Sequence, residues 1–227
     1  MATINASKAG YVIGQSSTTF ATSRQNGTSV VAAPSSVQSI AIKYTATSGR
    51  GSLTHAMTRT FLYFDTSGLT GTISDASLNI EGDANHNIDV AVFKSTAFGG
   101  DGGTALATSD FFSTIDFSTA YFVGQDWVPT TNNLDLNSTA NADIQNDDAF
   151  ICALVEKQKD GGNVAATSAT SRQASIDFGT TITLTFTEAA AASGPANLTS
   201  YNGIAKASIT SINGIAIANV TTLNGIS

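Results

Sequence analysis

The segment Thr180-Thr181-Ile182-Thr183-Leu184-Thr185-Phe186-Thr187 alternates between apolar and polar side chains with a period of two. In an extended chain, this spacing places Ile182, Leu184 and Phe186 on one face and the threonines on the other. One apolar and one polar face are typical of a half-buried strand in an antiparallel sheet. The segment therefore predicts a sheet that covers a core with one side only.

Other segments share this character, because they are rich in Val, Ile, Thr, Phe and Tyr and are bounded by Gly, Asn, Asp and Ser. They are residues 10–13, 29–32, 39–44, 59–64, 74–80, 87–94 and 149–156. Only residues 138–145 favour a helix, of one or two turns. Many strands with little helix predict an all-β fold, an antiparallel jelly-roll β-sandwich over residues 1–187.

Charge is scarce and unevenly distributed along the chain. Charged residues make up 12% of the 227 residues, and the net charge is −7. Residues 1–60 hold basic residues and no acidic one, whereas acidic residues dominate residues 81–160. This asymmetry indicates either a solvated acidic face or a field that orients like subunits head to tail. No basic cluster is interleaved with aromatics, so we expect no binding to nucleic acid.

The N-terminal residues and the single cysteine restrict the class of protein further. Residues 1–5 lack the basic and apolar regions of a secretory signal, and no apolar run approaches membrane-spanning length. The sequence therefore predicts a chain made in a cytoplasm, with no membrane partner. Cys152 lies in an apolar run and is expected to be a buried strand residue, without a disulfide or zinc partner in the chain.

The C-terminal residues form a repeat. After a linker of small residues at 188–199, residues 200–227 contain Asn-Gly at 202, 213 and 224, a period of 11. Asn-Gly favours a type I′ turn, so each unit could be a strand that leads into a tight turn. The units could form a small meander or stack around a symmetry axis as a fibrous trimer, and the alternative is a weakly ordered tail.

So short a repeat cannot bury its apolar side chains alone and needs a partner surface. We therefore expect the tail to be an assembly interface. Its candidate contact residues are Tyr201, Ile204, Ile209, Ile212, Ile215, Ile217, Val220, Leu223 and Ile226.

Residues 58–69, Thr-Arg-Thr-Phe-Leu-Tyr-Phe-Asp-Thr-Ser-Gly-Leu, continue into Thr-Ile-Ser-Asp-Ala-Ser-Leu at 72–78. This pattern resembles jelly-roll β-sandwich modules of bacteriophage virion proteins and of bacterial surface proteins related to carbohydrate-binding modules. The tail is similar to tails on structural proteins of tailed phages. The resemblance implies a component of the virion, made in the host cytoplasm: a capsid decoration, a head fibre or a tail appendage. It carries over no catalytic residue.

Aromatic residues crowd into residues 111–127, and two interpretations of them remain open. They could fill the core or a subunit interface, or they could form an exposed platform for a host surface glycan, with Trp127 and Asp126 as the candidate contacts. Histidines 55 and 86 are expected in surface loops.

Acidic residues between 110 and 148 could suggest a glycosidase, and the Asp-Gly-Gly segments at 101 and 160 could suggest calcium. Turn-forming roles explain both patterns better. We thus expect no enzyme, no cofactor and no metal, and predict a non-enzymatic phage virion structural protein that binds other virion proteins and copies of itself. The alternative is a carbohydrate-binding receptor-recognition or adhesin module.

Overall fold

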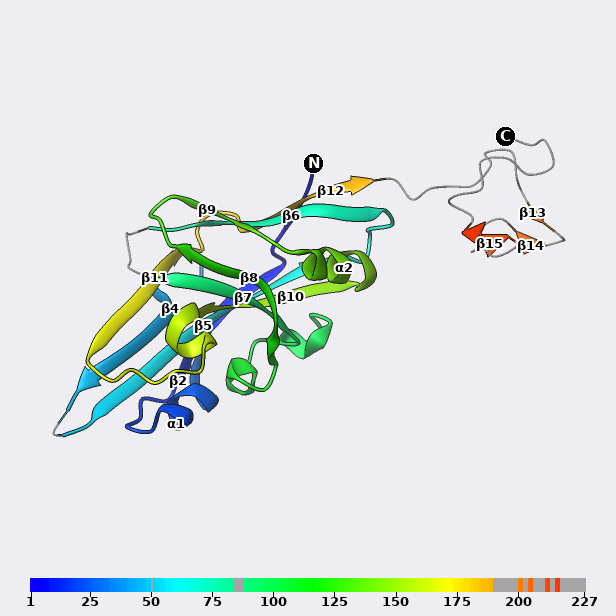
Figure 1. Ribbon diagram of the computed structural model, residues 1–227. Coiled ribbons are helices and arrows are strands. Elements are labelled where there is room, and N and C mark those ends of the chain that lie inside the picture. Colours follow the sequence, from blue (N-terminus) through cyan, green and yellow to red (C-terminus); the bar gives the residue numbers. More distant parts are fainter. Residues whose placement is uncertain are drawn as a thin grey trace. The chain divides into compact units, whose positions relative to one another are not determined.

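The computed structural model describes residues 1–49, 51–83, 88–189, 200–201, 204–205, 211–212 and 215–216. The chain divides into two compact units. Met1–Gly68 and Ile73–Thr187 form the first unit, called the sandwich below. Leu69–Thr72 and Glu188–Ser227 form the second unit, called the tail unit. The structure confirms the all-β prediction, because antiparallel strands dominate the sandwich and pack as two layers (Figure 1).

The smaller layer, sheet A, has four strands. In spatial order they are β1 (Ala2–Asn5), β12 (Thr183–Ala189), β6 (Thr72–Glu81) and β9 (Thr131–Asp135). Strand β12 contains residues 183–187 of the alternating segment of the sequence. Its Leu184 and Phe186 are fully buried, whereas Thr183 and Thr185 are half-buried, so the predicted division into two faces is confirmed.

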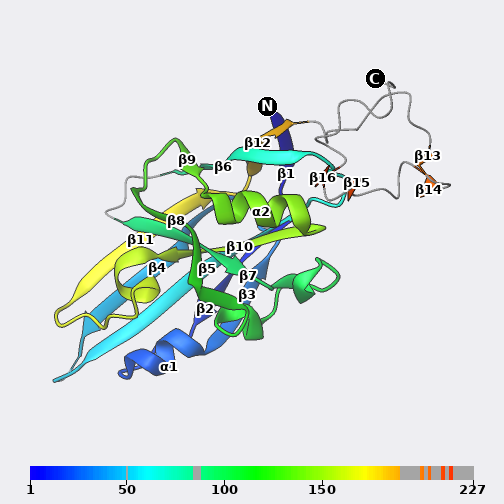
Figure 2. The ribbon, with the colours of Figure 1, turned by 45° about the vertical axis from the view of Figure 1, so that its right-hand side comes forward.

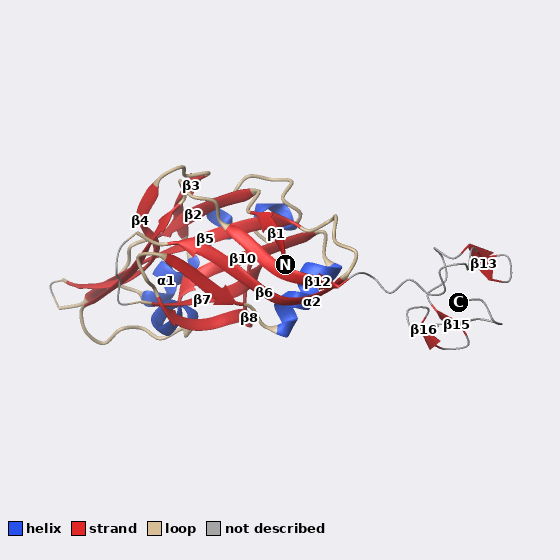
Figure 3. Cartoon of the chain, turned by 90° about the horizontal axis from the view of Figure 1, so that it is seen from above, coloured by secondary structure: helices blue, strands red, loops and turns tan. Residues whose placement is uncertain are grey.

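The larger layer, sheet B, has eight strands. Its strands are β2 (Lys8–Gly14), β3 (Gly27–Ala32), β4 (Val37–Ser48), β5 (Leu53–Asp65), β7 (Asp89–Ser95), β8 (Ile115–Asp126), β10 (Ala149–Glu156) and β11 (Thr170–Asp177). The long central strand β5 pairs antiparallel with β2, β4 and β10. Figure 3 shows the strands of sheet A crossing over this sheet.

The chain passes from one sheet to the other through two residues, Ala6 and Ser7. The amide of Ala6 donates to the carbonyl of Ile182, next to β12, and the amide of Ser7 donates to the carbonyl of Tyr63 in β5. Two successive residues therefore belong to different layers. This crossover ties sheets A and B together at one corner of the sandwich.

Both faces of sheet B are buried. On one face, a cluster of apolar side chains includes Phe61 of β5 and Ile151 and Val155 of β10. Residues that alternate with these, such as Leu62 and Leu154, point to the other face, toward sheet A, and are fully buried as well. A strand buried on both sides explains why residues 149–156 are apolar nearly throughout, and Cys152 is buried as predicted.

Short helices cover the face of sheet B that points away from sheet A. They are α1 (Phe20–Gln25) and the single turns η1 (Phe98–Gly100), η2 (Thr108–Phe111) and η3 (Lys157–Gly161). Figure 2 shows α1 below the sheet and α2 (Ser138–Asn146) beside β6 and β10. Helix α2 was predicted, and the side chain of Asn137 caps it by accepting the amide of Ala140 at 3.1 Å.

In the tail unit, two short antiparallel pairs repeat at the period of the sequence. Strand β13 (Ser200–Tyr201) pairs with β14 (Ile204–Ala205), and β15 (Ser211–Ile212) pairs with β16 (Ile215–Ala216). In both pairs the register leaves two residues, an Asn-Gly, between the paired ends. That register is the one expected when Asn-Gly connects a two-residue hairpin. The third copy of the repeat lies outside the described residues.

Candidate functional site

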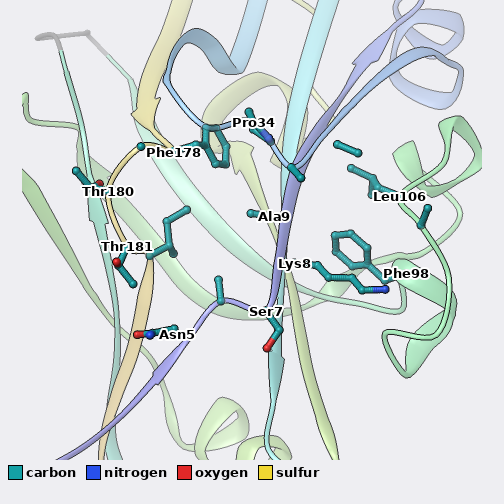
Figure 4. Close-up of a pocket in the computed structure, with 16 residues that line it drawn as sticks. Asn5, Ser7, Lys8, Ala9, Pro34, Phe98, Leu106, Phe178, Thr180 and Thr181 are labelled. Carbon is teal, nitrogen blue, oxygen red and sulfur yellow. The ribbon is translucent and has the colours of Figure 1, made fainter.

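The sandwich has a groove of about 690 Å³ beside the crossover between the sheets (Figure 4). Four buried apolar side chains are among its lining residues: Phe98, Leu106, Phe178 and Ile182. Small residues line much of the rest, namely Ala6, Ala9, Ala32, Ala33, Ala105 and Gly179. This groove, called the corner groove below, falls within the size range of sites that bind small molecules or short chain segments.

The rim of the corner groove is polar but almost uncharged. Asn5, Ser7, Thr180 and Thr181 stand exposed around it, and Lys8 is its one titratable side chain. The ammonium of Lys8 donates to the carbonyl of Gly102 and, at 3.0 Å, to that of Thr104. Figure 4 shows the stem of Lys8 lying alongside the ring of Phe98. Lys8 therefore fastens the loop at residues 98–106 to β2. The residues that line the groove offer apolar surface but no pair of groups for acid–base chemistry.

A second hollow, of about 450 Å³, is polar. Lys94 of β7 lies there 2.9 Å from a carboxylate oxygen of Asp143 on α2 and 3.7 Å from one of Asp147. The hydroxyl of Tyr121 donates to the same oxygen of Asp143 at 2.5 Å. Burial lowers the pKa of Lys94, but the bond and charge of Asp143 and the charge of Asp147 outweigh burial, so the net shift is upward. The arrangement is an ion pair that fastens α2 to sheet B.

On the face of sheet B that points away from sheet A, the carboxylate of Asp160 binds two buried arginines, Arg24 and Arg59. Arg59 of β5 and Asp160 of η3 have no exposed surface, and Arg59 donates to the two oxygens of Asp160 at 2.7 and 2.6 Å. Arg24 of α1 lies 3.5 Å from Asp160 and also donates to its backbone carbonyl. Burial lowers the pKa of Arg24, and the charge of Asp160 opposes that shift.

Aromatic rings cover the two guanidinium groups. The Arg59 guanidinium carbon lies 4.1 Å from the ring centroid of Phe111, and that of Arg24 lies 4.2 Å from the ring centroid of Phe117. Such cation–π contacts add to the attraction of the carboxylate. Together with Asp160 these residues, called the arginine cluster below, fasten α1, η2 and η3 onto one face of sheet B.

The sequence contained no local signal for the arginine cluster, since its partners are far apart along the chain. It also changes the interpretation of the charge asymmetry. Of the basic residues in the first 60, Arg24 and Arg59 are buried and paired, so these two add no charge to the surface of the N-terminal stretch. The Asp160 segment, considered for calcium, instead holds the two arginines.

The prediction that His55 lies in a surface loop is also wrong. It sits within β5, is 5% exposed, and its Nδ1 lies 2.9 Å from the hydroxyl of Tyr44, which accepts the amide of Ala166. Burial lowers the pKa of His55. The imidazole takes part in a buried hydrogen-bond chain between sheet B and the loop at residue 166. His86 lies outside the described residues.

Trp127 is buried in this structure, as the first of the two interpretations of these aromatics has it, and not exposed as a sugar platform would be. Its side chain is 2% exposed, and its indole nitrogen donates to the carbonyl of Ser175 at 2.9 Å. Phe111 and Tyr121 are buried as well, which confirms the core interpretation of these aromatics. Asp126, the second candidate for a glycan contact, is exposed on β8, but the ring beside it faces the interior.

Two of the carboxylates considered for catalysis, Asp110 and Asp116, hold turns. Asp110 accepts the amide of Ala107, and Asp116 accepts the hydroxyl and amide of Ser118. The hydrogen bonds to Asp116 lower its pKa, and the bond from the Ser118 hydroxyl has the largest effect. In the part of the chain that the structure describes, no group of His, Cys, Asp and Glu side chains is arranged to hold a metal ion.

Of the predicted tail contacts, the structure describes the side chain of Ile212, which is 5% exposed. Tyr201, Ile204 and Ile215 lie in the short paired strands. The other candidates lie outside the described residues: Ile209, Ile217, Val220, Leu223 and Ile226.

No protein-family model matches this chain, and no match is found among curated proteins. No helix in the described part of the chain has the length and apolar character needed to cross a membrane.

Proposed function

We propose that this protein is a non-enzymatic structural component of a phage virion, a capsid decoration, head fibre or tail appendage, which its C-terminal repeats anchor. The observation that carries the proposal is the repeated pair of two-residue strands, each pair with Asn-Gly between its two strands in the sequence. An isolated two-stranded hairpin is at best marginally stable in water. Hairpins this short, with apolar residues beside each turn, fit a segment that becomes stable against a partner.

The sandwich supports the same role. Its buried charges fasten helices to sheet B, and the carboxylates of Asp110 and Asp116 hold turns. The resemblance of residues 58–80 to jelly-roll virion modules supports a displayed domain, and that segment forms β5 and β6 with the turn between them. We infer that the sandwich is presented and that the tail attaches it.

The test measures occupancy on purified particles assembled with chain supplied in trans. We compare the wild-type chain, a chain that ends at residue 196, Ile212→Asp and the control Ser211→Ala. Ile212 is buried and Ser211 is exposed, so the control changes the neighbouring residue without touching buried apolar surface. We expect the truncated chain and Ile212→Asp to be lost from particles and Ser211→Ala to be retained. Wild-type occupancy of the truncated chain would refute anchoring by the tail, and absence of the wild-type chain from particles would refute the virion role.

A further inference from the structure

The loop that follows β7 has a strained backbone at its buried end. Phe98 is 2% exposed and has a φ of 58°, in the left-handed region that a bulky residue rarely adopts. The next residue, Gly99, also has a positive φ, of 84°. A strained backbone persists only where the surrounding contacts hold it, and it is found preferentially in segments that switch conformation. The contacts that hold this loop therefore decide its conformation.

Residues 99–105, called the flap below, lie between Phe98 and the buried Leu106. Gly102 is half-buried, and the other residues of the flap are exposed. Hollow space lies on both sides of the flap, because Ala105 lines the corner groove whereas Gly100 and Asp101 line the polar hollow. A segment with exposed residues and open space beside it has low local stability. The flap thus has room to move without displacing packed side chains.

Two paired side chains of sheet B hold the middle of the flap. Lys8 of β2 and Tyr63 of β5 lie directly opposite each other, so their side chains share one face of the sheet. The ammonium of Lys8 donates to the carbonyls of Gly102 and Thr104 (Figure 4). The ring of Tyr63 lies so close to Gly102 that a methyl group there would overlap it. These contacts of Lys8 and Tyr63 are called the latch below.

We propose that the flap opens as one unit when the latch releases Gly102, and that the strain at Phe98 favours opening. In the closed form described here, Phe98 and Leu106 are buried at the two ends of the flap. Opening lets Phe98 leave the left-handed region and exposes both side chains to the corner groove, which they line. The latch therefore sets how much apolar surface the groove exposes. This device does not depend on the proposed function of the tail.

Amide hydrogen exchange of the full-length chain, measured by NMR for each residue, detects this opening. Two amides report on the flap: Gly100 donates to the carbonyl of Ala97, and Thr104 donates to that of Phe98, both at 3.1 Å. The first bond spans Phe98 and the second ends on it, so both break when its backbone relaxes. The amide of Leu154, a fully buried residue of β10, reports on global unfolding. In the wild type, we expect the two flap amides to share one protection factor, at least about 100-fold below that of Leu154.

Two variants release the latch in different ways. Lys8→Met keeps a side chain of similar length but removes the ammonium, and Gly102→Ala places a methyl group against the ring of Tyr63. Because hydrogen bonds from a charged donor are strong, we expect Lys8→Met to lower both flap protection factors by the same factor, about tenfold. Gly102→Ala should also lower both together, and Leu154 should keep its protection in each variant.

Two matched controls leave the latch intact. Lys43→Met changes another half-buried lysine of sheet B, and Gly51→Ala places an alanine at a comparable φ of 83° where no atom lies within 4 Å. Both controls should leave the flap amides as they are in the wild type.

The wild type alone can overturn the proposal, if its flap amides exchange only with Leu154. Unequal responses of the two flap amides would also overturn it, as would a folded latch variant that leaves both unchanged. Loss of Leu154 protection in both latch variants would contradict it as well, because the latch would then support the whole sandwich and not the flap.

Discussion

Replacing Asp160 with asparagine should destabilise the sandwich far more than the loss of one surface charge would. The amide side chain would keep the volume of the carboxylate but would direct an N–H group at Arg59, where the carboxylate now accepts bonds at 2.7 and 2.6 Å. Arg24, 3.5 Å away, would lose the same charge. Removing one partner from a buried ion pair costs about 3–5 kcal/mol.

That loss is a large share of the roughly 5–15 kcal/mol that stabilises a typical folded domain. At about 2–4 °C per kcal/mol, the melting temperature should fall by roughly 6–20 °C. Trp127 provides the assay, because it is the one tryptophan, is 2% exposed, and becomes solvated on unfolding. Urea and thermal unfolding followed by its fluorescence give the free energy of unfolding and the melting temperature.

The matched control is Asp135→Asn, an exposed aspartate on β9. Substitutions at such surface positions usually change stability by within about 0.5 kcal/mol. If Asp160→Asn lost less than about 1 kcal/mol, or no more than the control, the conclusion that the arginine cluster holds the helices on sheet B would be incorrect.

Three further predictions concern other parts of the sandwich. Burial lowers the pKa of His55 below its unfolded value of about 6.5, so the unfolded chain binds more protons and stability should fall as the pH drops from 7 toward 5. His55→Asn should flatten this slope in unfolding experiments, and an unchanged slope would contradict the assignment. A methyl group at Gly27 would overlap the carbonyl of Thr108, so Gly27→Ala should cost about 1–3 kcal/mol of unfolding free energy, whereas Gly68→Ala, with open space around it, should cost none. Burial raises the pKa of the Cys152 thiol, so iodoacetamide should label it, by mass spectrometry, only after urea unfolds the chain; rapid labelling of the native protein would contradict its burial.

Strands with a strong local pattern could be predicted from the sequence, and the structure contains a strand at every segment proposed. The strands that were missed have weak patterns of their own. Residues 131–135, Thr-Asn-Asn-Leu-Asp, have low strand propensity, and pairing with β6 makes them a strand. Strand β8 contains Gly124 at a positive φ of 85° and several polar residues, and β11 carries Arg172 and Gln173.

The candidate site was harder to predict, because its parts meet only in the folded chain. The corner groove brings together residues near 5, 33, 98 and 180, and none of these segments has a binding motif. Arg59 and Asp160 are 101 residues apart, and either residue alone would be placed on the surface by its charge. His55 was misplaced for a related reason, since Gly49 and Gly51 suggested a loop that ends before β5 begins at Leu53.

The position of β12 has a mechanical consequence. It lies between β1 and β6 in sheet A, and it is the last strand before the linker. A pull on the tail would load β12 along its length, against hydrogen bonds to both neighbours at once. In this shear geometry the bonds share the force, whereas a strand peeled sideways from an edge would lose them one at a time. If the tail anchors the protein as we propose, a pull on the anchored end would therefore be opposed by the bonds of β12 to both of its neighbours.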